Sequence, residues 1–211
     1  MTITDTSRLP LSGGQSGLWF AQRLDPDNSI FNTAEYVEIT GRLDPGRLAE
    51  AIERTMNETD VLRVRFETEG ELVHQRVLDA TPYRVRVVDL RGRDDPRGAA
   101  LDWMRGDLAK PVDLTGGDLV AQVIFKVGEG THYWYQRAHH ILLDGYGYAL
   151  VQNRTADVYA ALTEGREPTP SPFRPLREAL GEEAAYRSSE RYDADRRYWL
   201  ERYGSMPAPA G

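Results

Sequence analysis

The sequence predicts an α/β (α+β) fold in which a mixed β-sheet is flanked by helices. Segments whose apolar residues alternate, as in strands, are interspersed with segments whose apolar residues recur at helical spacing. Glycine and proline separate most of these segments. Interspersed strands and helices typically form a sheet covered by helices, and a chain of 211 residues is long enough to bury a substantial core.

The first helix is expected to begin at Ser12 and to end at Leu24. Ser12 and Gln15 have the spacing of a capping box, in which each side chain accepts a hydrogen bond from the other residue's backbone N–H. Trp19 lies on the apolar face of this helix, and Pro26 follows its end.

A strand and a second helix are expected next. Residues 36–40 alternate as a strand does, and Asp44, which is followed by a proline, predicts the start of a helix. Residues 60–66 are expected to form another strand, with three apolar side chains on one face and Arg63 and Arg65 on the other.

A hairpin dominates the middle of the chain. Residues 119–127 and 131–138 both read as strands, and a glycine-rich turn joins them. The other expected elements are strands over residues 72–78 and 84–88 and helices over residues 95–109, 146–162, 176–188 and 191–203.

The composition excludes several classes of function. A formal net charge of -7 argues against nucleic acid or an anionic membrane as the main partner. The chain has no cysteine, so it has no disulfide, thiolate nucleophile or zinc–thiolate site. Its first residues lack a signal-peptide pattern, and no stretch approaches the ~20 apolar residues of a spanning helix. A cytoplasmic location is therefore predicted.

Two of the four histidines are consecutive residues at the end of the predicted hairpin. His139 and His140 precede Asp144 and Gly145 by a few residues. Neighbouring side chains of a strand point to opposite faces, so one histidine is expected to face a site and the other to pack. Gly145 is free to adopt a positive φ, which suits a sharp turn from the strand into the next helix.

The spacing His-His-x-x-x-Asp-Gly resembles the signature of condensation domains of non-ribosomal peptide synthetases and of the wider chloramphenicol-acetyltransferase-like acyltransferases. Fragments of two further motifs of this family lie upstream in the same order, at Ser12, Gln15, Leu18 and Trp19 and at Leu62, Arg63 and Phe66. The segments around residues 133–137 and 167–170 are similar to the start of enterobactin-type siderophore synthetases, whose donor is an aryl acid on a separate carrier.

The resemblance implies an amide-forming reaction with His140 as the base or the positioning group. It implies that His139, Asp144 and Gly145 support the motif loop and that Arg63 pairs with Asp144, although a solvated strand arginine is the plain alternative for Arg63. The donor is a carrier-bound acyl or aryl thioester and the acceptor a carrier-bound aminoacyl group. Both are carried on phosphopantetheine, so the chain itself is expected to bind neither a cofactor nor a metal.

The family fold has two similar lobes with the catalytic tunnel between them, and the resemblance covers roughly residues 9–203. We therefore expect residues 1–203 to form the N-terminal lobe and residues 204–211 a linker or truncated junction to a missing C-terminal lobe. An isolated lobe is expected to be inactive. The expected partners are donor and acceptor carrier proteins, the missing lobe and an adjacent adenylation domain. If Met1 is the native start, the donor carrier acts in trans.

Several alternatives stay open. The chain could be a related acyltransferase that uses free or coenzyme A substrates, an epimerising relative, or a non-catalytic lobe that binds carriers. The spacing of His139 and Asp144 also matches the dyad of glycerolipid acyltransferases, although the membrane-binding segments usual in those enzymes are lacking. A metal site is disfavoured because adjacent strand residues chelate poorly and no further ligand set completes the pair.

Overall fold

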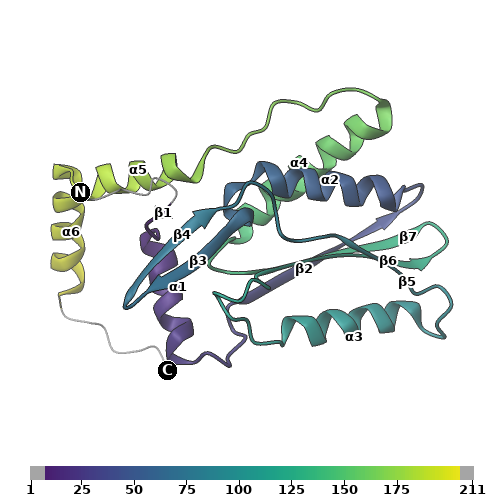
Figure 1. The fold of residues 1–211 in the computed structure, drawn as a ribbon, viewed down its shortest axis with the longest axis horizontal. Coiled ribbons are helices and arrows are strands. Elements are labelled where there is room, and N and C mark those ends of the chain that lie inside the picture. The colour runs from purple at the N-terminus through teal and green to yellow at the C-terminus, as the bar shows by residue number, and fades with distance from the viewer. Residues whose placement is uncertain (1–7, 205–211) are drawn as a thin grey trace. The chain divides into compact units, whose positions relative to one another are not determined.

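The computed structural model describes residues 8–204, which form two compact units divided between Phe173 and Arg174. The first unit holds a four-stranded and a three-stranded sheet (Figure 1). The predicted α/β class, a mixed sheet flanked by helices, is confirmed. Most of the predicted junction at 204–211 lies outside the described residues, so its role stays a prediction.

The four-stranded sheet has the order β2-β7-β6-β5. Its members are β2 (Asn32–Thr40), β5 (Arg86–Asp89), β6 (Val120–Gly128) and β7 (Thr131–His139). β2, β7 and β6 are antiparallel, whereas β5 is parallel to β6 because α3 (Pro96–Leu108) makes the crossover between them. The predicted hairpin forms the two central strands.

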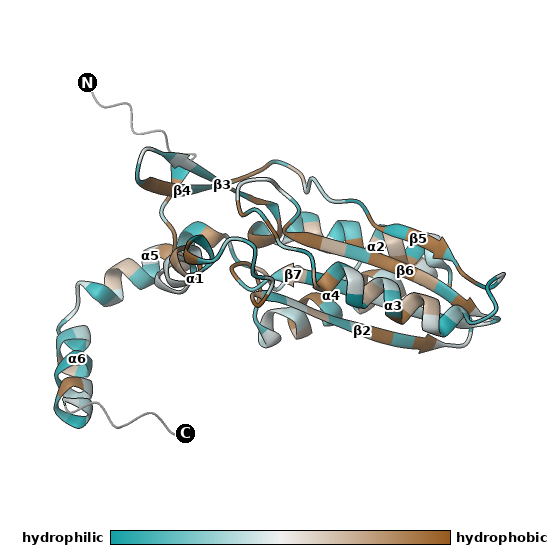
Figure 2. Ribbon diagram, turned by 90° about the horizontal axis from the view of Figure 1, so that it is seen from below, coloured by the Kyte–Doolittle hydropathy of each residue, from teal (hydrophilic) through white to brown (hydrophobic). Residues whose placement is uncertain are grey.

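Helices cover both faces of this sheet. Figure 1 shows α3 along one face and α2 (Pro45–Glu58) and α4 (Gly145–Glu164) along the other. Tyr133 and Tyr135 pack with Ala100 and Met104 of α3 in one buried cluster. Figure 2 shows the hydrophobic residues that run along β6, most of which are buried. The core therefore lies between β6 and β7 and the helices on either side.

A buried ion pair fastens α3 to β7. Arg137 Nε donates to Asp107 Oδ2 over 2.7 Å, and the Tyr135 hydroxyl donates to the same oxygen over 3.0 Å. The Arg137 guanidinium also donates to the Asp118 carbonyl. The side chains of Asp107 and Arg137 are only 8% and 5% exposed, so each charge depends on the other for its stabilisation.

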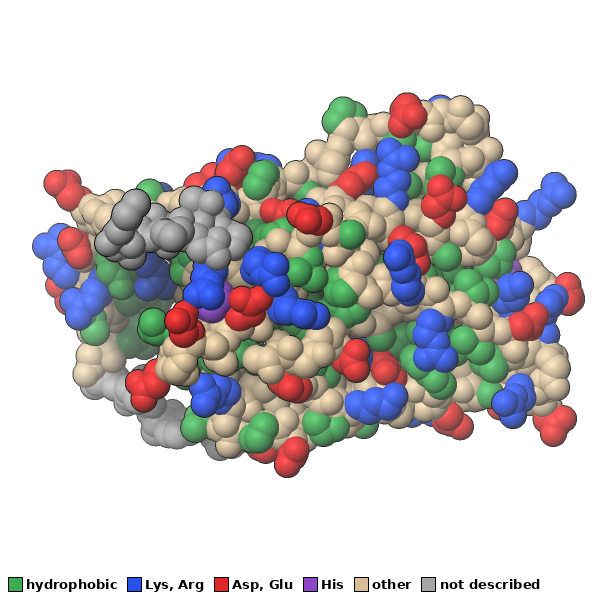
Figure 3. All heavy atoms as spheres, viewed as in Figure 1, with side chains coloured by type: hydrophobic (Ala, Val, Ile, Leu, Met, Phe, Trp, Pro, Cys, Tyr) green, Lys and Arg blue, Asp and Glu red, His purple; other side chains and the backbone are tan. Residues whose placement is uncertain are grey.

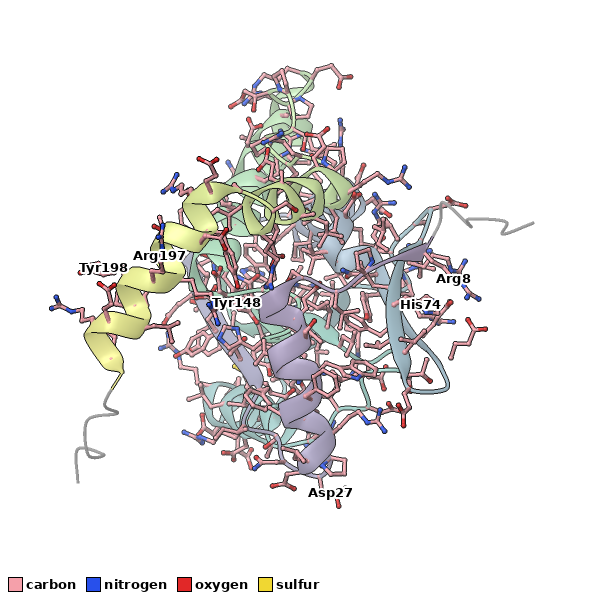
Figure 4. All side chains as sticks on the ribbon, turned by 90° about the vertical axis from the view of Figure 1, so that its left-hand side faces the viewer. Arg8, Asp27, His74, Tyr148, Arg197 and Tyr198 are labelled. Carbon is pink, nitrogen blue, oxygen red and sulfur yellow. The ribbon has the colours of Figure 1, made fainter. Side chains whose placement is uncertain are left out.

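The three-stranded sheet is antiparallel and lies beside α1 (Gly13–Leu24) (Figure 1). Its strands are β1 (Arg8–Leu9), β4 (Leu72–Val77) and β3 (Val64–Glu69). The Trp19 ring of α1 packs 5.7 Å from the Phe66 ring of β3, centroid to centroid. His74, labelled in Figure 4, pairs with Glu67 across β4 and β3 at 3.0 Å, which accounts for it without a functional role.

The start of β3 differs from the prediction. Residues Asp60–Arg63 form a 3₁₀ turn, and the strand begins only at Val64. Leu62 is buried in either arrangement, so its apolar character does not distinguish a turn from a strand. β1 was not predicted, because a strand of two residues is too short to show the alternation of apolar and polar side chains.

The second unit contains α5 (Leu176–Arg187) and α6 (Glu190–Tyr203), close to their predicted ranges. On α6 the Trp199 ring stacks on the Tyr203 ring, with centroids 5.6 Å apart. Ser189 caps α6 by accepting a hydrogen bond from the Tyr192 N–H. Across residues 8–204, none of the helices combines the length and the apolar character needed to cross a bilayer.

Candidate active site

β7 ends at His139, and backbone hydrogen bonds from three sides hold the turn that follows. The His139 N–H donates to the Leu119 carbonyl over 2.9 Å, and the His140 N–H donates to the Phe31 carbonyl over 2.7 Å. The Leu142 N–H donates to the His139 carbonyl over 2.9 Å and closes a β-turn. The predicted sharp break between strand and helix is therefore confirmed.

His139 is the packed member of the pair, with 1% of its surface exposed. Its Nδ1 accepts from the Ile141 N–H over 3.1 Å, so the proton of the neutral ring sits on Nε2. Nε2 lies 3.1 Å from Gln22 Oε1. The Gln22 amide nitrogen donates to the backbone carbonyls of Asp25 and Asn28, which fixes its oxygen toward His139. His139 thus joins α1 to the motif turn.

His140 is the exposed member of the pair. Its Nδ1 lies 2.8 Å from the Leu143 carbonyl oxygen, which can only accept a hydrogen bond. Nδ1 therefore carries the proton, and the unprotonated Nε2 of the neutral ring keeps its lone pair available for a ligand. The arrangement agrees with the prediction that one histidine of the pair packs, and it leaves His140 as the one that could face a site.

Asp144 is the N-cap of α4. Its Oδ1 accepts from the Gly147 N–H over 2.7 Å, and its carbonyl accepts from the Tyr148 N–H over 3.0 Å. This cap starts α4 directly after the motif turn and satisfies one of the otherwise unpaired N–H groups of the first turn. Asp144 therefore supports the motif loop through the backbone of its own helix.

Arg63 does not pair with Asp144 as expected. Its guanidinium contacts Asp60 Oδ1 at 2.6 Å and donates to the backbone carbonyls of Leu78 and Asp79. The 3₁₀ turn places Asp60 three residues from Arg63, so this local pair forms without closing a long loop. Within residues 8–204 no ion pair joins Arg63 to Asp144.

Gly145 does not need the positive φ that was expected of it. It is the first residue of α4, and the glycines with positive φ lie elsewhere in the chain. A Cβ built on Gly145 meets no atom within 4 Å among the described residues. The space beside its backbone is therefore open.

Gly145→Ala is expected to leave the free energy of unfolding within about 1 kcal/mol of the parent value, because alanine is the better helix former. Urea unfolding of both proteins checks this. A larger loss of stability would contradict the negative φ. If the variant folds normally but loses activity, a ligand must approach the Gly145 backbone closely.

Tyr148 and Gln15 also stabilise the motif turn. The sequence did not predict this role for either side chain. The Tyr148 hydroxyl of α4, labelled in Figure 4, accepts from the Ala138 N–H over 2.7 Å and donates to the Thr33 carbonyl over 2.7 Å. The Gln15 amide donates to Gln75 Oε1 over 3.0 Å and lies 3.4 Å from the Ile141 carbonyl. Gln15 was predicted only as part of a capping box, which is also present.

The burial of His139 predicts a dependence of stability on pH. Burial, with the neighbouring His140 and Arg137, lowers the pKa of His139 to about 4 from 6.5. The unfolded chain therefore binds a proton between these values that the folded chain does not, and folding is destabilised as the pH falls from 6.5 toward 4. At about 1.4 kcal/mol per pH unit, the loss approaches roughly 3 kcal/mol.

Urea unfolding at pH 7 and pH 4.5 measures this loss. The His139→Gln variant is the matched control, because it removes the titrating ring and keeps a polar side chain. Its loss of stability over this range is expected to be smaller than that of the parent by about 2 to 3 kcal/mol. Equal losses in the two proteins would show that the pKa of His139 is the same in the folded and the unfolded chain.

The geometry brings His139, His140, Asp144 and Gly145 into one turn and places Arg63 in another network. Within the part of the chain described, no group of three or more His, Asp or Glu side chains is arranged to hold a metal ion. The site thus offers an exposed imidazole at His140 and an open backbone at Gly145, on a turn held by several elements.

Comparison with known proteins identifies the family of this arrangement. Residues 6–208 match the condensation domain family. The chain is 40% identical over 207 residues to a dimodular non-ribosomal peptide synthase of Bacillus subtilis (strain 168), covering 98% of this chain and 9% of that protein. It is 37% identical to enterobactin synthase component F of Shigella flexneri, covering 97% of this chain and 16% of that protein.

A solved structure gives the same result. The starter condensation domain of rhizomide synthetase, crystallised with C8-CoA and Leu-SNAC, superposes with a TM-score of 0.92 at 36% identity. The match covers 97% of this chain and 47% of that one. The chain therefore spans about half of that solved condensation domain. Its sequence and its fold show that the chain belongs to the condensation domain family.

Proposed function

We propose that this chain is the N-terminal lobe of a condensation domain that forms an amide bond in non-ribosomal peptide synthesis. The donor is a carrier-bound acyl or aryl thioester, and the acceptor is a carrier-bound aminoacyl group. The relatives that are peptide and enterobactin synthases support this reading. The observation that carries the proposal is the fixed tautomer of His140, with Nδ1 toward the Leu143 carbonyl and no hydrogen bond from Nε2 to residues 8–204.

That tautomer suits the chemistry of amide formation. An α-ammonium group has a pKa of about 7.7 to 8, so part of the acceptor amine is neutral near pH 7. As the amine attacks the thioester carbonyl, its nitrogen acquires positive charge and must lose a proton. His140 Nε2 can accept that proton or a hydrogen bond from it, and the thiolate leaves the tetrahedral species. Alignment of the two tethered substrates would contribute much of the remaining acceleration.

The exposure of the turn supports an incomplete active site. His140, Asp144, Gly145 and Tyr146 are all exposed, and the Tyr146 side chain is 74% exposed. Condensation of tethered substrates needs a site that excludes water and holds both ends in line. We infer that a C-terminal lobe covers this turn and that the isolated chain is inactive. The rhizomide starter domain, about twice as long, is consistent with this inference.

The partners follow from the same proposal. Donor and acceptor carrier proteins would deliver phosphopantetheine-bound substrates, and an adenylation domain of the same assembly would load the acceptor carrier. The matched relatives are far longer than this chain, which leaves room for such domains. The likeness to enterobactin synthase component F favours an aryl donor delivered by a separate carrier.

Reconstitution tests this proposal. Acyl-loaded and aminoacyl-loaded carrier proteins are mixed with this chain alone and with the chain extended by its natural C-terminal continuation, and amide product is measured by mass spectrometry. Product only with the extended chain, and dependent on His140, supports the proposal. Product from this chain alone would contradict the half-site inference. A full set of donors with no product would exclude amide formation.

A related acyltransferase activity is the second candidate. The rhizomide starter domain was crystallised with C8-CoA, a free coenzyme A thioester. If the extended chain accepts octanoyl-CoA as well as an octanoyl carrier protein, its donor is not restricted to carriers. If neither thioester reacts while the lobe still binds a carrier in a pull-down, the chain is a non-catalytic platform.

A further inference from the structure

A cavity lies at the opposite end of β7 from His140. It has a volume of about 750 Å³ and is bounded by the loop between β2 and α2, the β6–β7 turn and α4. His132, which lines it, is seven residues from His139 along the strand, a separation of about 23 Å. Figure 3, viewed as Figure 1, shows basic and acidic side chains intermixed around the end of the sheet where this turn lies. The cavity is therefore separate from the motif turn.

The charged side chains that line this cavity are mainly basic. Arg42, Arg47, Arg91 and Lys126 contribute four positive charges, against the two carboxylates of Asp44 and Glu129. Most of the protein has the opposite balance, because the formal net charge of the chain is -7. The cavity is thus a local positive site on an acidic protein, which attracts anions.

Two of the four cations form no salt bridge with residues 8–204, although Lys126 lies close enough to Asp89 to help lower the pKa of that carboxyl. Arg91 is paired with Asp89 and Glu129, and Arg47 lies 3.6 Å from Asp44. Neither the Arg42 nor the Lys126 side chain takes part in a hydrogen bond or an ion pair with residues 8–204. Arg42 is exposed and Lys126 is half-buried, so both side chains are available to a ligand.

The cavity also contains a buried imidazole without a partner. His132 is 7% exposed, and its Nδ1 has no hydrogen-bond partner in the described part of the chain. It lies directly opposite Lys126 in the register of β6 and β7. Burial, together with Lys126 and Arg91, lowers the pKa of His132, so the ring is neutral near pH 7. A buried polar atom left unpaired costs free energy that a ligand can recover.

Tyr159 supplies a further donor. Its hydroxyl oxygen accepts from the Asp44 N–H over 3.0 Å, which orients the phenol from α4 toward the start of α2. The hydroxyl proton is then free to be donated to an acceptor in the cavity. The donors therefore come from a loop, a hairpin and a helix that converge on one space.

We propose that this cavity binds a phosphate-bearing small molecule, with Arg42 and Lys126 as the charge partners and Tyr159 and His132 as hydrogen-bond partners. A phosphate group has more acceptor oxygens and more charge than a carboxylate, so it can engage donors from several directions at once. The volume exceeds what one phosphate fills and lies within the range of sites for drug-sized ligands. The remainder of the ligand would occupy the uncharged part of the cavity.

Calorimetric titration of the 211-residue chain at 150 mM NaCl tests the proposal. The probes are inorganic pyrophosphate, AMP, coenzyme A and, as a comparison anion, sulfate. Arg42→Gln/Lys126→Gln is expected to weaken binding of the best phosphate probe at least tenfold. Arg105→Gln/Arg187→Gln removes the same charge from exposed positions outside the cavity and is expected to change it less than twofold. Equal weakening in both variants would overturn the proposal.

The probes distinguish the sources of the phosphate. Binding of pyrophosphate with a similar affinity to AMP and coenzyme A would identify a free anion, whereas tighter binding of either ester would identify an organic phosphate. Both results support the site. Sulfate that binds as tightly as every phosphate probe, or no binding by any probe, overturns it.

Nuclear magnetic resonance of the unmodified chain gives a second measurement, in which binding is detected without a change to the cavity. The imidazole ¹⁵N signals of His132, assigned by their loss in His132→Gln, are expected to shift on addition of the best probe, while those of His140 stay unchanged. A shift of His140 with none at His132 would place the ligand at the motif turn and overturn the assignment.

Discussion

His140→Ala is expected to lower the rate of amide formation about 100- to 10,000-fold in the chain extended by its C-terminal continuation. A positioned side chain that moves a proton in the transition state contributes about this much. The fold should be unaffected, because His140 is exposed and, among the described residues, its ring makes one hydrogen bond, to the Leu143 carbonyl. The free energy of unfolding is expected to fall by no more than about 1 kcal/mol.

Single-turnover kinetics with both carriers loaded measures this loss at the chemical step. His74→Ala is the matched control, since it removes an imidazole that pairs with Glu67 away from the motif turn, and its rate should equal that of the parent. His140→Gln separates the two roles of the ring. Glutamine can orient the amine but cannot take its proton, so near-parental activity in this variant would assign His140 to positioning. A His140→Ala variant with parental activity would remove the histidine from the mechanism.

Asp107→Asn is expected to destabilise the chain by about 3 to 5 kcal/mol, the cost of leaving a buried charge without its partner. Asp107 accepts from Arg137 and Tyr135, and the side chains of Asp107 and Arg137 are no more than 8% exposed. The asparagine keeps the shape but not the charge, so Arg137 stays buried with only neutral acceptors, such as the Asp118 carbonyl, opposite its guanidinium. Chemical denaturation followed by circular dichroism measures the loss.

The double variant Asp107→Leu/Arg137→Met tests the cause of that loss. When both charges are removed, no unpaired charge remains, and well-packed apolar replacements of buried ion pairs are often neutral or stabilising. The double variant is therefore expected to be more stable than Asp107→Asn alone. If it is less stable, the pair contributes mainly through its specific hydrogen bonds, including the bond from Tyr135.

The sequence predicted the features whose causes are local. The capping box of Ser12 and Gln15 and the turn between β6 and β7 depend on residues within a few positions of one another, and both are present. The alternation of side chains along a strand predicted that one of His139 and His140 would pack, and His139 is buried whereas His140 is exposed. The family resemblance located the same turn, because its motif is a continuous run of residues.

The features that were wrong or missed depend on distant or ambiguous contacts. Arg63 was paired with Asp144 on the resemblance, whereas a 3₁₀ turn gives it a nearer acid in Asp60. Nothing in the spacing of Gln22 shows that its amide meets His139 across 117 positions. Gly145 was given a positive φ because glycine permits one, but a helix begins there without it. A residue that can adopt a positive φ does not by itself cause the backbone to adopt one.

Three hydrogen bonds at the end of β7 together fix the position of the backbone there. The Ala138 N–H donates to the Tyr148 hydroxyl. The next two N–H groups, those of His139 and His140, donate to the Leu119 and Phe31 carbonyls. Each acceptor belongs to a different part of the first unit, so the backbone position of His140 depends on residues outside the motif, whereas the Leu143 carbonyl inside the motif orients its ring. A peptide that carries only His139 to Gly145 would contain the motif residues but not the three acceptors that position their backbone. Transfer of the turn to another protein scaffold would therefore require equivalents of all three acceptors.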